Sequence, residues 1–374
     1  MRWLALALFL LAAPSANAAE EERSELAALL DADNEAFPRA TEPRPFVFPD
    51  DHGPHPEYRN EWWYVTGNLE AASGRRFGFE LTIFRFALAP GIEASPSAWR
   101  SNQVYIAHLA VTDPGDERFV VAEKYSRGAL GLAGAQASPF AVWIDDWSIR
   151  ARDPAGERER WQLLAETAEI GLDLELDAQK APVLNGDDGL SQKSPEPGNA
   201  SYYYSITRLA TAGELRLGDE TFRVTGTSWL DREWSSSALG QEQTGWDWFA
   251  LQLGDGSELM FYNLRLRDGT SDANSAGTYV RPDGEAIHVR RDDVTLTVLD
   301  TWDSPEGGTY PARWRIAVPA AGIDVEVTPV MPDQELFTTV RYWEGAVDVS
   351  GTVSGRAADG VGYVELTGYA ESPE

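Results

Sequence analysis

The sequence contains no cysteine, which excludes disulfide bonds, thiolate metal sites and a cysteine nucleophile. It has only 4 histidines, so a nitrogen-rich metal site has few residues to draw on. Positive charge is also scarce, since 31 Lys and Arg stand against 60 Asp and Glu, for a net charge of −29. Such a surface repels phosphate backbones and anionic membranes. We therefore expect no nucleic-acid partner.

Long apolar runs are absent beyond the first residues, and the chain begins with the pattern of an export signal. Arg2 precedes an apolar run over residues 3–13, and Ala16 and Ala18 supply the small residues of a cleavage site. The run is shorter than the roughly 20 residues that span a bilayer, so we expect no stable membrane insertion. The pattern predicts that residues 1–18 are a signal peptide and that the protein is periplasmic or secreted.

Local motifs for familiar chemistry are missing as well. The sequence has no G-x-S-x-G elbow, no H-E-x-x-H zinc pattern, no P-loop and no dinucleotide fingerprint. We therefore expect no cofactor, and nothing local indicates a serine hydrolase.

Short apolar-alternating runs dominate the rest of the chain. They are closed by Gly, Asp, Asn or Pro at spacings of about 8–12 residues, which is typical of antiparallel sandwiches and barrels. Residues 19–43 form a predicted extension, with a short helix over residues 24–37. Residues 182–201 are rich in Gly, Pro, Asn, Asp and Ser. A division near them predicts two domains, at residues 44–209 and 210–374.

Two aromatic segments indicate an internal repeat. WWYVTGNL at residues 62–69 aligns without a gap with WDWFALQL at residues 246–253, and each is followed by a glycine turn and a later arginine. Because strand residues alternate faces, each segment has one mainly apolar face and one face that is aromatic at one end. The aromatic faces have two interpretations: packing at a barrel end or domain interface, or the wall of an apolar ligand pocket.

A pair of carboxylates lies between these segments. Asp231 and Glu233 flank Arg232, and in an extended strand both carboxylates point to one face and the arginine to the other. Paired carboxylates can divide into a proton donor and a proton acceptor. The alternative is that their charges simply pair with Arg85, Arg265 or Arg267.

The stretch DDHGPHP combines Asp51, His52 and His55 with two prolines and a glycine. These residues favour a rigid turn at a barrel mouth over a metal site, because no helix sets the ligand spacing. We expect His52 or His55 to hydrogen-bond to neighbouring strands, and His52 remains a candidate acid or base.

Longer blocks of sequence resemble a known family. They include FPDDHGPHPEYRNEWWYVTGNL, VTGTSWLDREWSSSALGQEQTGWDWFALQL and GYVELTGYAE. These blocks resemble the lipocalin-like AttH family, which contains bacterial carotenoid 1,2-hydratases, over nearly all of residues 46–370. The resemblance implies an all-β protein with two tandem lipocalin-like antiparallel β-barrels. It also implies an apolar substrate held in a barrel or between the two.

Only some of the functional residues of the hydratases have counterparts in this sequence. In the hydratases a histidine and a tryptophan occupy the segment that looks like DREW, with a tyrosine and an aspartate slightly downstream. Here Trp234 and Tyr262 stand at matching positions, whereas Arg232 replaces the histidine and Asn263 is nearest to the aspartate.

The expected function is binding of a lipid or isoprenoid in an aromatic pocket, with possible water addition. A secreted hydrolase of an apolar ester and a non-catalytic carrier are the alternatives, so whether the protein is an enzyme stays open. The candidate catalytic residues are Asp231, Glu233, His52 and Tyr262. The candidate ligand-binding residues are Trp62, Tyr64, Arg85, Arg232, Trp234, Trp246 and Trp248. The sequence does not predict an oligomeric state.

Overall fold

The computed structural model describes residues 36–91, 97–153, 158–237 and 239–370. Within these ranges the chain forms two antiparallel sheets, and its only helical elements are single 3-10 turns. The predicted all-β class is therefore confirmed. The predicted signal peptide and the helix over residues 24–37 lie outside the described residues, except for the last two positions of that helix. No helix in the described ranges has the length and hydropathy to cross a membrane.

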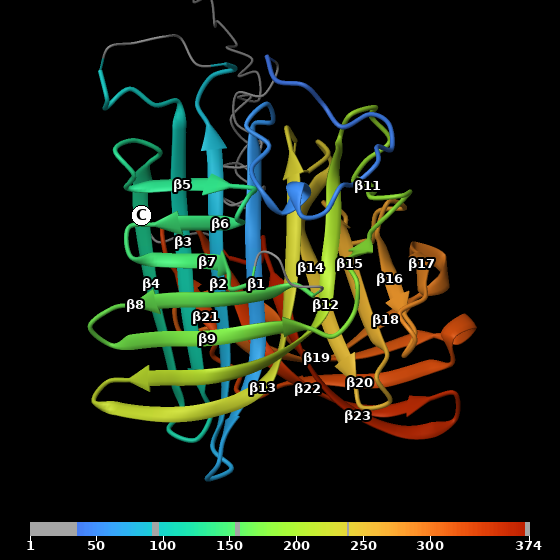
Figure 1. Cartoon of the computed structure of the whole chain (residues 1–374). Helices are drawn as coiled ribbons and strands as arrows, with labels where there is room; N and C mark the ends of the chain where they lie inside the picture. Colours follow the sequence, from blue (N-terminus) through green and yellow to red (C-terminus); the bar gives the residue numbers. More distant parts are fainter. Residues whose placement is uncertain (1–35, 92–96, 154–157, 238, 371–374) are drawn as a thin grey trace, which may run out of the picture.

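The first sheet has 13 strands and folds back over itself, because β5–β9 run across β1–β4 (Figure 1). Its main order is β4-β3-β2-β1-β13-β12-β9-β8-β7-β6-β5, with β10 and β11 paired to β12. The 3-10 turn η2 (Asp50–His52) precedes the sheet. The strands are β1 (Asn60–Ala71), β2 (Arg76–Ala87), β3 (Gln103–Asp113), β4 (Arg118–Arg127), β5 (Ala133–Gln136), β6 (Ala141–Ile144), β7 (Trp147–Ala151), β8 (Arg160–Glu166), β9 (Ile170–Ala178), β10 (Val183–Leu184), β11 (Leu190–Gln192), β12 (Ala200–Leu217) and β13 (Glu220–Ser235).

The second sheet has 10 strands in the order β17-β16-β15-β14-β23-β22-β20-β19-β18, with β21 paired to β22. The 3-10 turns η3 (Arg291–Asp293) and η4 (Pro319–Ala321) connect parts of it. The strands are β14 (Gln243–Leu253), β15 (Glu258–Leu266), β16 (Ala276–Val280), β17 (Ala286–Arg290), β18 (Thr295–Asp303), β19 (Thr309–Val318), β20 (Ile323–Pro329), β21 (Glu335–Phe337), β22 (Arg341–Val353) and β23 (Arg356–Leu366).

The two sheets share one strand order, as the predicted repeat requires. In each sheet the aromatic strand, β1 or β14, hydrogen-bonds on one side to the next strand of the chain. On the other side it pairs with a late strand of its own sheet, β13 or β23. The sequence match of residues 62–69 with 246–253 thus joins topologically equivalent strands.

The sheets divide the chain after Ser235 and not at residue 209. Residues 209 and 210 lie inside β12, which pairs with both β9 and β13 of the first sheet. The loop-like stretch at 182–201 does not separate the two units, because its short strands β10 and β11 pair with β12. A domain boundary placed from composition alone therefore lies too close to the N-terminus.

Strand alternation separates the apolar interior of each sheet from the apolar contact between the sheets. Trp63, Val65 and Leu69 of β1 are buried inside the first sheet, and the matching face of β14 is buried inside the second. The opposite faces of β1 and β14 meet between the sheets, where Tyr64 contacts Trp248 edge to face at 5.1 Å between ring centroids. The aromatic faces of the repeat therefore form the contact between the two units.

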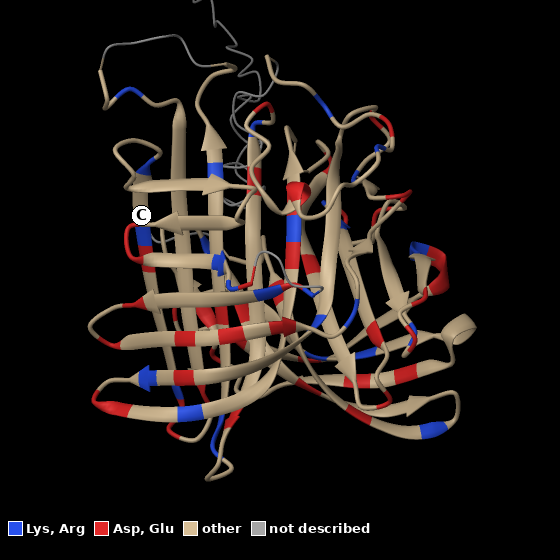
Figure 2. Cartoon of the chain, viewed as in Figure 1, with Lys and Arg blue, Asp and Glu red and all other residues tan. Residues whose placement is uncertain are grey.

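Polar side chains at the other ends of β1 and β14 form hydrogen bonds between the two sheets. The Asn68 amide of β1 donates to the Gly362 carbonyl of β23 at 3.0 Å. The Gln252 amide of β14 donates to the Ser228 carbonyl of β13 at 2.9 Å. These reciprocal bonds fix the two sheets against each other. Acidic residues are spread over both sheets and do not gather on one element (Figure 2).

Candidate functional site

A pocket lies between the two sheets, at the aromatic ends of β1 and β14. Its cavity has a volume of about 100 Å³. Because one water needs roughly 10–15 Å³, this space holds several waters or part of a small organic molecule. Trp62 and Trp246 are only partly buried, whereas the other rings are buried. The aromatic residues that line the pocket are Trp62, Tyr64, Phe84, Tyr203, Trp246, Trp248 and Tyr262.

Asp231 is the buried carboxyl group on the first-sheet wall of the pocket. It accepts hydrogen bonds from the hydroxyls of Tyr203 and Ser205 and, at 2.7 Å, from the Trp229 indole. The Trp248 indole in turn donates to the Tyr203 hydroxyl at 3.1 Å. Burial raises the pKa of Asp231 to about 7, even though these three donors act in the opposite direction. Near neutral pH this group is therefore able to give up a proton.

Glu233 lies two residues further along β13 and has a different environment. The Ser201 hydroxyl donates to it, and the Lys193 ammonium lies 3.4 Å from its carboxylate. Burial lowers the pKa of Lys193, but the charges of Glu233, Tyr262 and Asp231 and the hydrogen bond to Glu233 together outweigh it, so the net shift is upward. The Lys193 ammonium also lies 4.2 Å from the centre of the Tyr262 ring. Glu233 thus has a cation at ion-pair distance, whereas the three groups that donate hydrogen bonds to Asp231 are neutral.

The second sheet contributes polar groups to the same pocket. Glu365 of β23 lines it, and burial raises the pKa of this carboxyl group to about 8. The Tyr262 hydroxyl of β15 lies 2.9 Å from the Ser191 hydroxyl, next to β12. Carboxyl groups from both sheets therefore surround one aromatic space. Such a set can donate a proton, accept a proton and hold water beside an apolar group.

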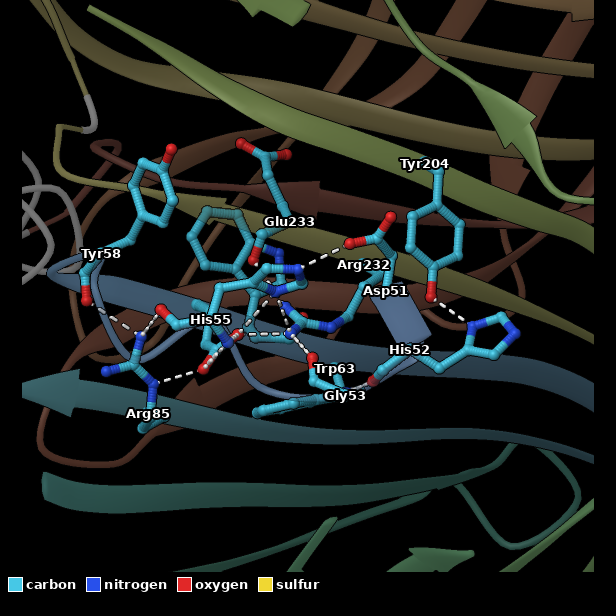
Figure 3. Close-up of polar contacts among 12 residues, drawn as sticks. Asp51, His52, Gly53, His55, Tyr58, Trp63, Arg85, Tyr204, Arg232 and Glu233 are labelled. Carbon is cyan, nitrogen blue, oxygen red and sulfur yellow. Dashed lines mark hydrogen bonds and ion pairs between the residues drawn. The ribbon is translucent and has the colours of Figure 1, made fainter. Parts of the chain in front are cut away.

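The neighbouring positions on β13 point the other way, into the first sheet (Figure 3). The Arg232 guanidinium donates to Glu61 and lies 4.0 Å from the centre of the Trp63 ring. Trp234 stacks on the His55 ring at 3.7 Å between centroids. The alternation predicted for the DREW segment is thus observed, with the two carboxylates on one face and Arg232 on the other.

Arg85 belongs to the same interior cluster (Figure 3). It donates to the Glu61 carboxylate and, at 3.0 Å each, to the carbonyls of His55 and Tyr58. Burial acts against ionisation of Glu61, but the charges of Arg85 and Arg232 outweigh it and hold its pKa below the usual range. Glu61, Arg85 and Arg232 thus form a buried ion triad on β1, β2 and β13, and backbone carbonyls of the stretch before β1 accept hydrogen bonds from its two arginines.

His52 is buried on the far side of this cluster. Its Nδ1 lies 2.6 Å from the Tyr204 hydroxyl of β12, and its Nε2 lies 3.1 Å from Glu159. The hydrogen bond to a neighbouring strand is the one expected from the sequence. The ring packs among Phe48, Phe140 and Trp161 rather than beside the pocket.

The structure brings together most of the candidate site residues but not all of them. The pocket takes in Asp231, Glu233, Tyr262, Trp62, Tyr64, Trp246 and Trp248. The interior of the first sheet holds His52, Arg85, Arg232 and Trp234. These four residues have packing and ion-pairing partners there and do not line the pocket between the sheets. Asp231 and Glu233 do not pair with Arg85, and Arg265 pairs instead with Asp247.

Five polar or aromatic residues of the pocket were not predicted from the sequence, namely Phe84, Lys193, Tyr203, Ser237 and Glu365. Tyr203 had a signal, because the middle residue of a Tyr-Tyr-Tyr run faces away from its two neighbours. Glu365 had a signal in the repeat, because it is the counterpart of Asp231: Trp248 pairs with Glu365 just as Tyr64 pairs with Asp231. Lys193 follows β11 in a loop, where no periodicity indicates which way it points.

No group of three or more His, Asp or Glu side chains within the described ranges is arranged to hold a metal ion. In particular, Asp51 is engaged by Arg44 and His55, at 2.9 and 3.0 Å.

The comparisons with known proteins agree with this architecture. The AttH-like family model matches residues 39–369. A crystal structure of an AttH protein from Nitrosomonas europaea is 34% identical, with a TM-score of 0.79 over 89% of this chain and 100% of that one. Kievitone hydratase from Nectria haematococca shares the fold at 17% identity, with a TM-score of 0.64 over 90% of this chain and 98% of that one.

A third structure, CghA with Sch210972, is 13% identical and has a TM-score of 0.54 over 91% of this chain and 98% of that one. No curated protein sequence is similar enough to count as a match. The family model and the 34% identical structure both extend across nearly all of the two sheets. The chain therefore belongs to the AttH-like family.

Proposed function

We propose that this protein binds an apolar molecule between its two sheets and adds water to a carbon–carbon double bond of that molecule. The single observation that carries the proposal is the contrast between Asp231 and Glu233 on one pocket wall. Asp231 is surrounded by neutral donors and holds its proton to about pH 7, whereas Glu233 faces an ammonium group. Two carboxyl groups in contrasting environments are the usual basis for a donor and an acceptor in one site.

In the proposed reaction, Asp231 transfers its proton to one carbon of the double bond. The positive charge that develops on the other carbon lies among aromatic rings, whose faces attract cations. Water attacks that carbon, its O–H bond breaks, and Glu233 takes the released proton. The alcohol product then holds the atoms of one water, Asp231 has lost a proton to carbon, and Glu233 has gained one from the water.

A relative supports the choice of reaction and of a first test compound. Kievitone hydratase has this fold, and its name states that it hydrates kievitone. We would therefore incubate the purified protein with kievitone, and separately with compounds released from the denatured protein and identified by mass spectrometry. A product heavier by one water supports the proposal. A bound compound that never gains water would instead support a carrier.

Binding can be tested without any substrate. We expect Trp246→Ala to weaken binding of the neutral fluorescent probe N-phenyl-1-naphthylamine by about tenfold or more, because a large aromatic anchor is removed from the pocket. Fluorescence titration gives the dissociation constant. Trp143→Ala is the matched control, since Trp143 is also partly buried but lies on β6, outside the pocket. Equal weakening in both variants would contradict binding between the sheets.

A further inference from the structure

Three carboxyl groups gather where the two sheets meet, and the proposed reaction uses none of them. We call Glu80 of β2, Glu344 of β22 and Glu365 of β23 the interface carboxyls. Glu80 and Glu344 have no exposed surface. Glu344 and Glu365 are direct cross-strand partners. One barrel thus supplies one of these groups and the other barrel supplies two.

The two innermost interface carboxyls lack the partners that a buried charge requires. Glu344 has the neutral hydroxyls of Tyr64 and Tyr342 as hydrogen-bonding neighbours, and Oε2 of Glu80 has no hydrogen bond within the described residues. The Thr82 hydroxyl donates to the other oxygen of Glu80. No lysine or arginine of the described chain forms an ion pair with an interface carboxyl.

A carboxylate without a cation or several donors is too costly to bury, so such groups take up a proton. Burial and the charges of neighbouring carboxylates raise the pKa of Glu344 well above its usual range. Burial likewise raises the pKa of Glu80. The titratable groups that act on the interface carboxyls come from β1, β13, β22 and β23, and they are Tyr64, Asp231, Glu233, Tyr342 and Tyr363. His108 of β3 in turn lies 2.7 Å from the Tyr342 hydroxyl.

Glu365 connects this set to the pocket. It lines the pocket together with Asp231 and Glu233, and the charges of those two residues act on it. Its position in the second sheet is the counterpart of Asp231 in the first, because Trp248 pairs with Glu365 as Tyr64 pairs with Asp231. Glu365 therefore faces both the donor and the acceptor of the proposed reaction, with neutral carboxyls behind it.

We infer that Glu365 is a catalytic residue that returns the proton from Glu233 to Asp231 after each turnover. This inference rests on the proposed function, which leaves Asp231 ionised and Glu233 protonated. Glu365 gives its proton to Asp231 and then accepts the proton that Glu233 took from water. Each O–H bond that breaks is replaced by another, so no outside acid is consumed. Glu344 and Glu80 act as positioning residues that keep a second charge away from Glu365.

The test is Glu365→Gln, followed in the first and in later turnovers with kievitone or the co-purified compound that gains water. We expect one product per protein at the wild-type rate, because Asp231 still holds its proton. Later turnovers should be about 10²-fold slower. A small carboxylic acid added to the buffer should restore them, which a merely structural defect would not allow. The inference would be overturned if Glu365→Gln kept the wild-type steady-state rate. It would also be overturned if the variant were already slow in its first turnover.

A second measurement needs no substrate and separates this inference from the proposed function. Glu365 adjoins Trp246, so tryptophan emission should change as Glu365 titrates near pH 8. We expect Glu365→Gln to remove that change and Asp231→Asn to retain it at a lower pH, because the Asp231 charge no longer raises the pKa of Glu365. Both variants should bind N-phenyl-1-naphthylamine within about threefold of wild type. If the change in tryptophan emission near pH 8 persisted in Glu365→Gln, it would contradict the inference, whether or not water addition is observed.

Discussion

Glu61→Gln is expected to lower the free energy of unfolding by about 3–5 kcal/mol, because it leaves two buried guanidinium groups without their anion. Glu61 has no exposed surface and accepts hydrogen bonds from both Arg85 and Arg232. The His55 backbone N–H donates to the same carboxylate at 3.0 Å. Chemical denaturation followed by tryptophan fluorescence gives the difference. Glu57→Gln is the control, since Glu57 is exposed nearby and should change stability little.

The same ion triad sets a pH dependence of stability. The folded pKa of Glu61 lies below that of an unfolded glutamate, which is about 4.3. Its contribution is therefore fully present above that value and is lost as the pH falls towards the folded pKa. We expect Glu61→Gln to flatten this part of the stability profile. If the free energy of unfolding of the variant fell with decreasing pH as steeply as in the wild type, the triad would not control this pH dependence.

The β1 and β14 faces show what the sequence could predict. Period-two alternation placed Trp63 and Val65 inside one barrel. It placed Trp62 and Tyr64 on the opposite face of their strand, and Trp246 and Trp248 on the matching face of theirs. It could not place the two surfaces against each other, because strand pairing within each unit says nothing about packing between units. The contact between them became visible only in three dimensions.

The DREW segment shows where similarity to a family misleads. Aligned as a continuous motif, it suggests that Arg232 and Trp234 act together with Asp231 and Glu233. Alternation divides the segment instead: two residues face the pocket, and two belong to the interior ion triad and its aromatic neighbours. His52 is a similar case, since nothing in DDHGPHP indicates that its ring is enclosed by three aromatic residues.

The loop residue Lys193 could not be predicted for a different reason. Its position depends on how the chain between β11 and β12 returns to the contact between the sheets. Composition indicates that this segment is irregular but gives no direction for its side chains. The cation that distinguishes Glu233 from Asp231 is therefore a property of the tertiary structure alone.

Asp231→Asn is the variant with the largest expected effect on the proposed reaction. The amide fills nearly the same space but has no acidic proton, so the rate of water addition should fall about 10²- to 10⁴-fold. In the wild type the rate should decline above about pH 7, because the donor must be protonated and its pKa lies there. Initial rates measured across pH, with the compound that gains water, provide both quantities.

The variant should also lose the first-turnover burst that Glu365→Gln retains, because no proton is available at Asp231 even once. Its affinity for N-phenyl-1-naphthylamine should stay within about threefold of wild type, which separates loss of chemistry from loss of the pocket. Glu70→Gln, an exposed change on β1, serves as a control that should leave rate and pH profile unchanged. If Asp231→Asn kept the wild-type rate and its decline with pH, another group would have to supply the proton.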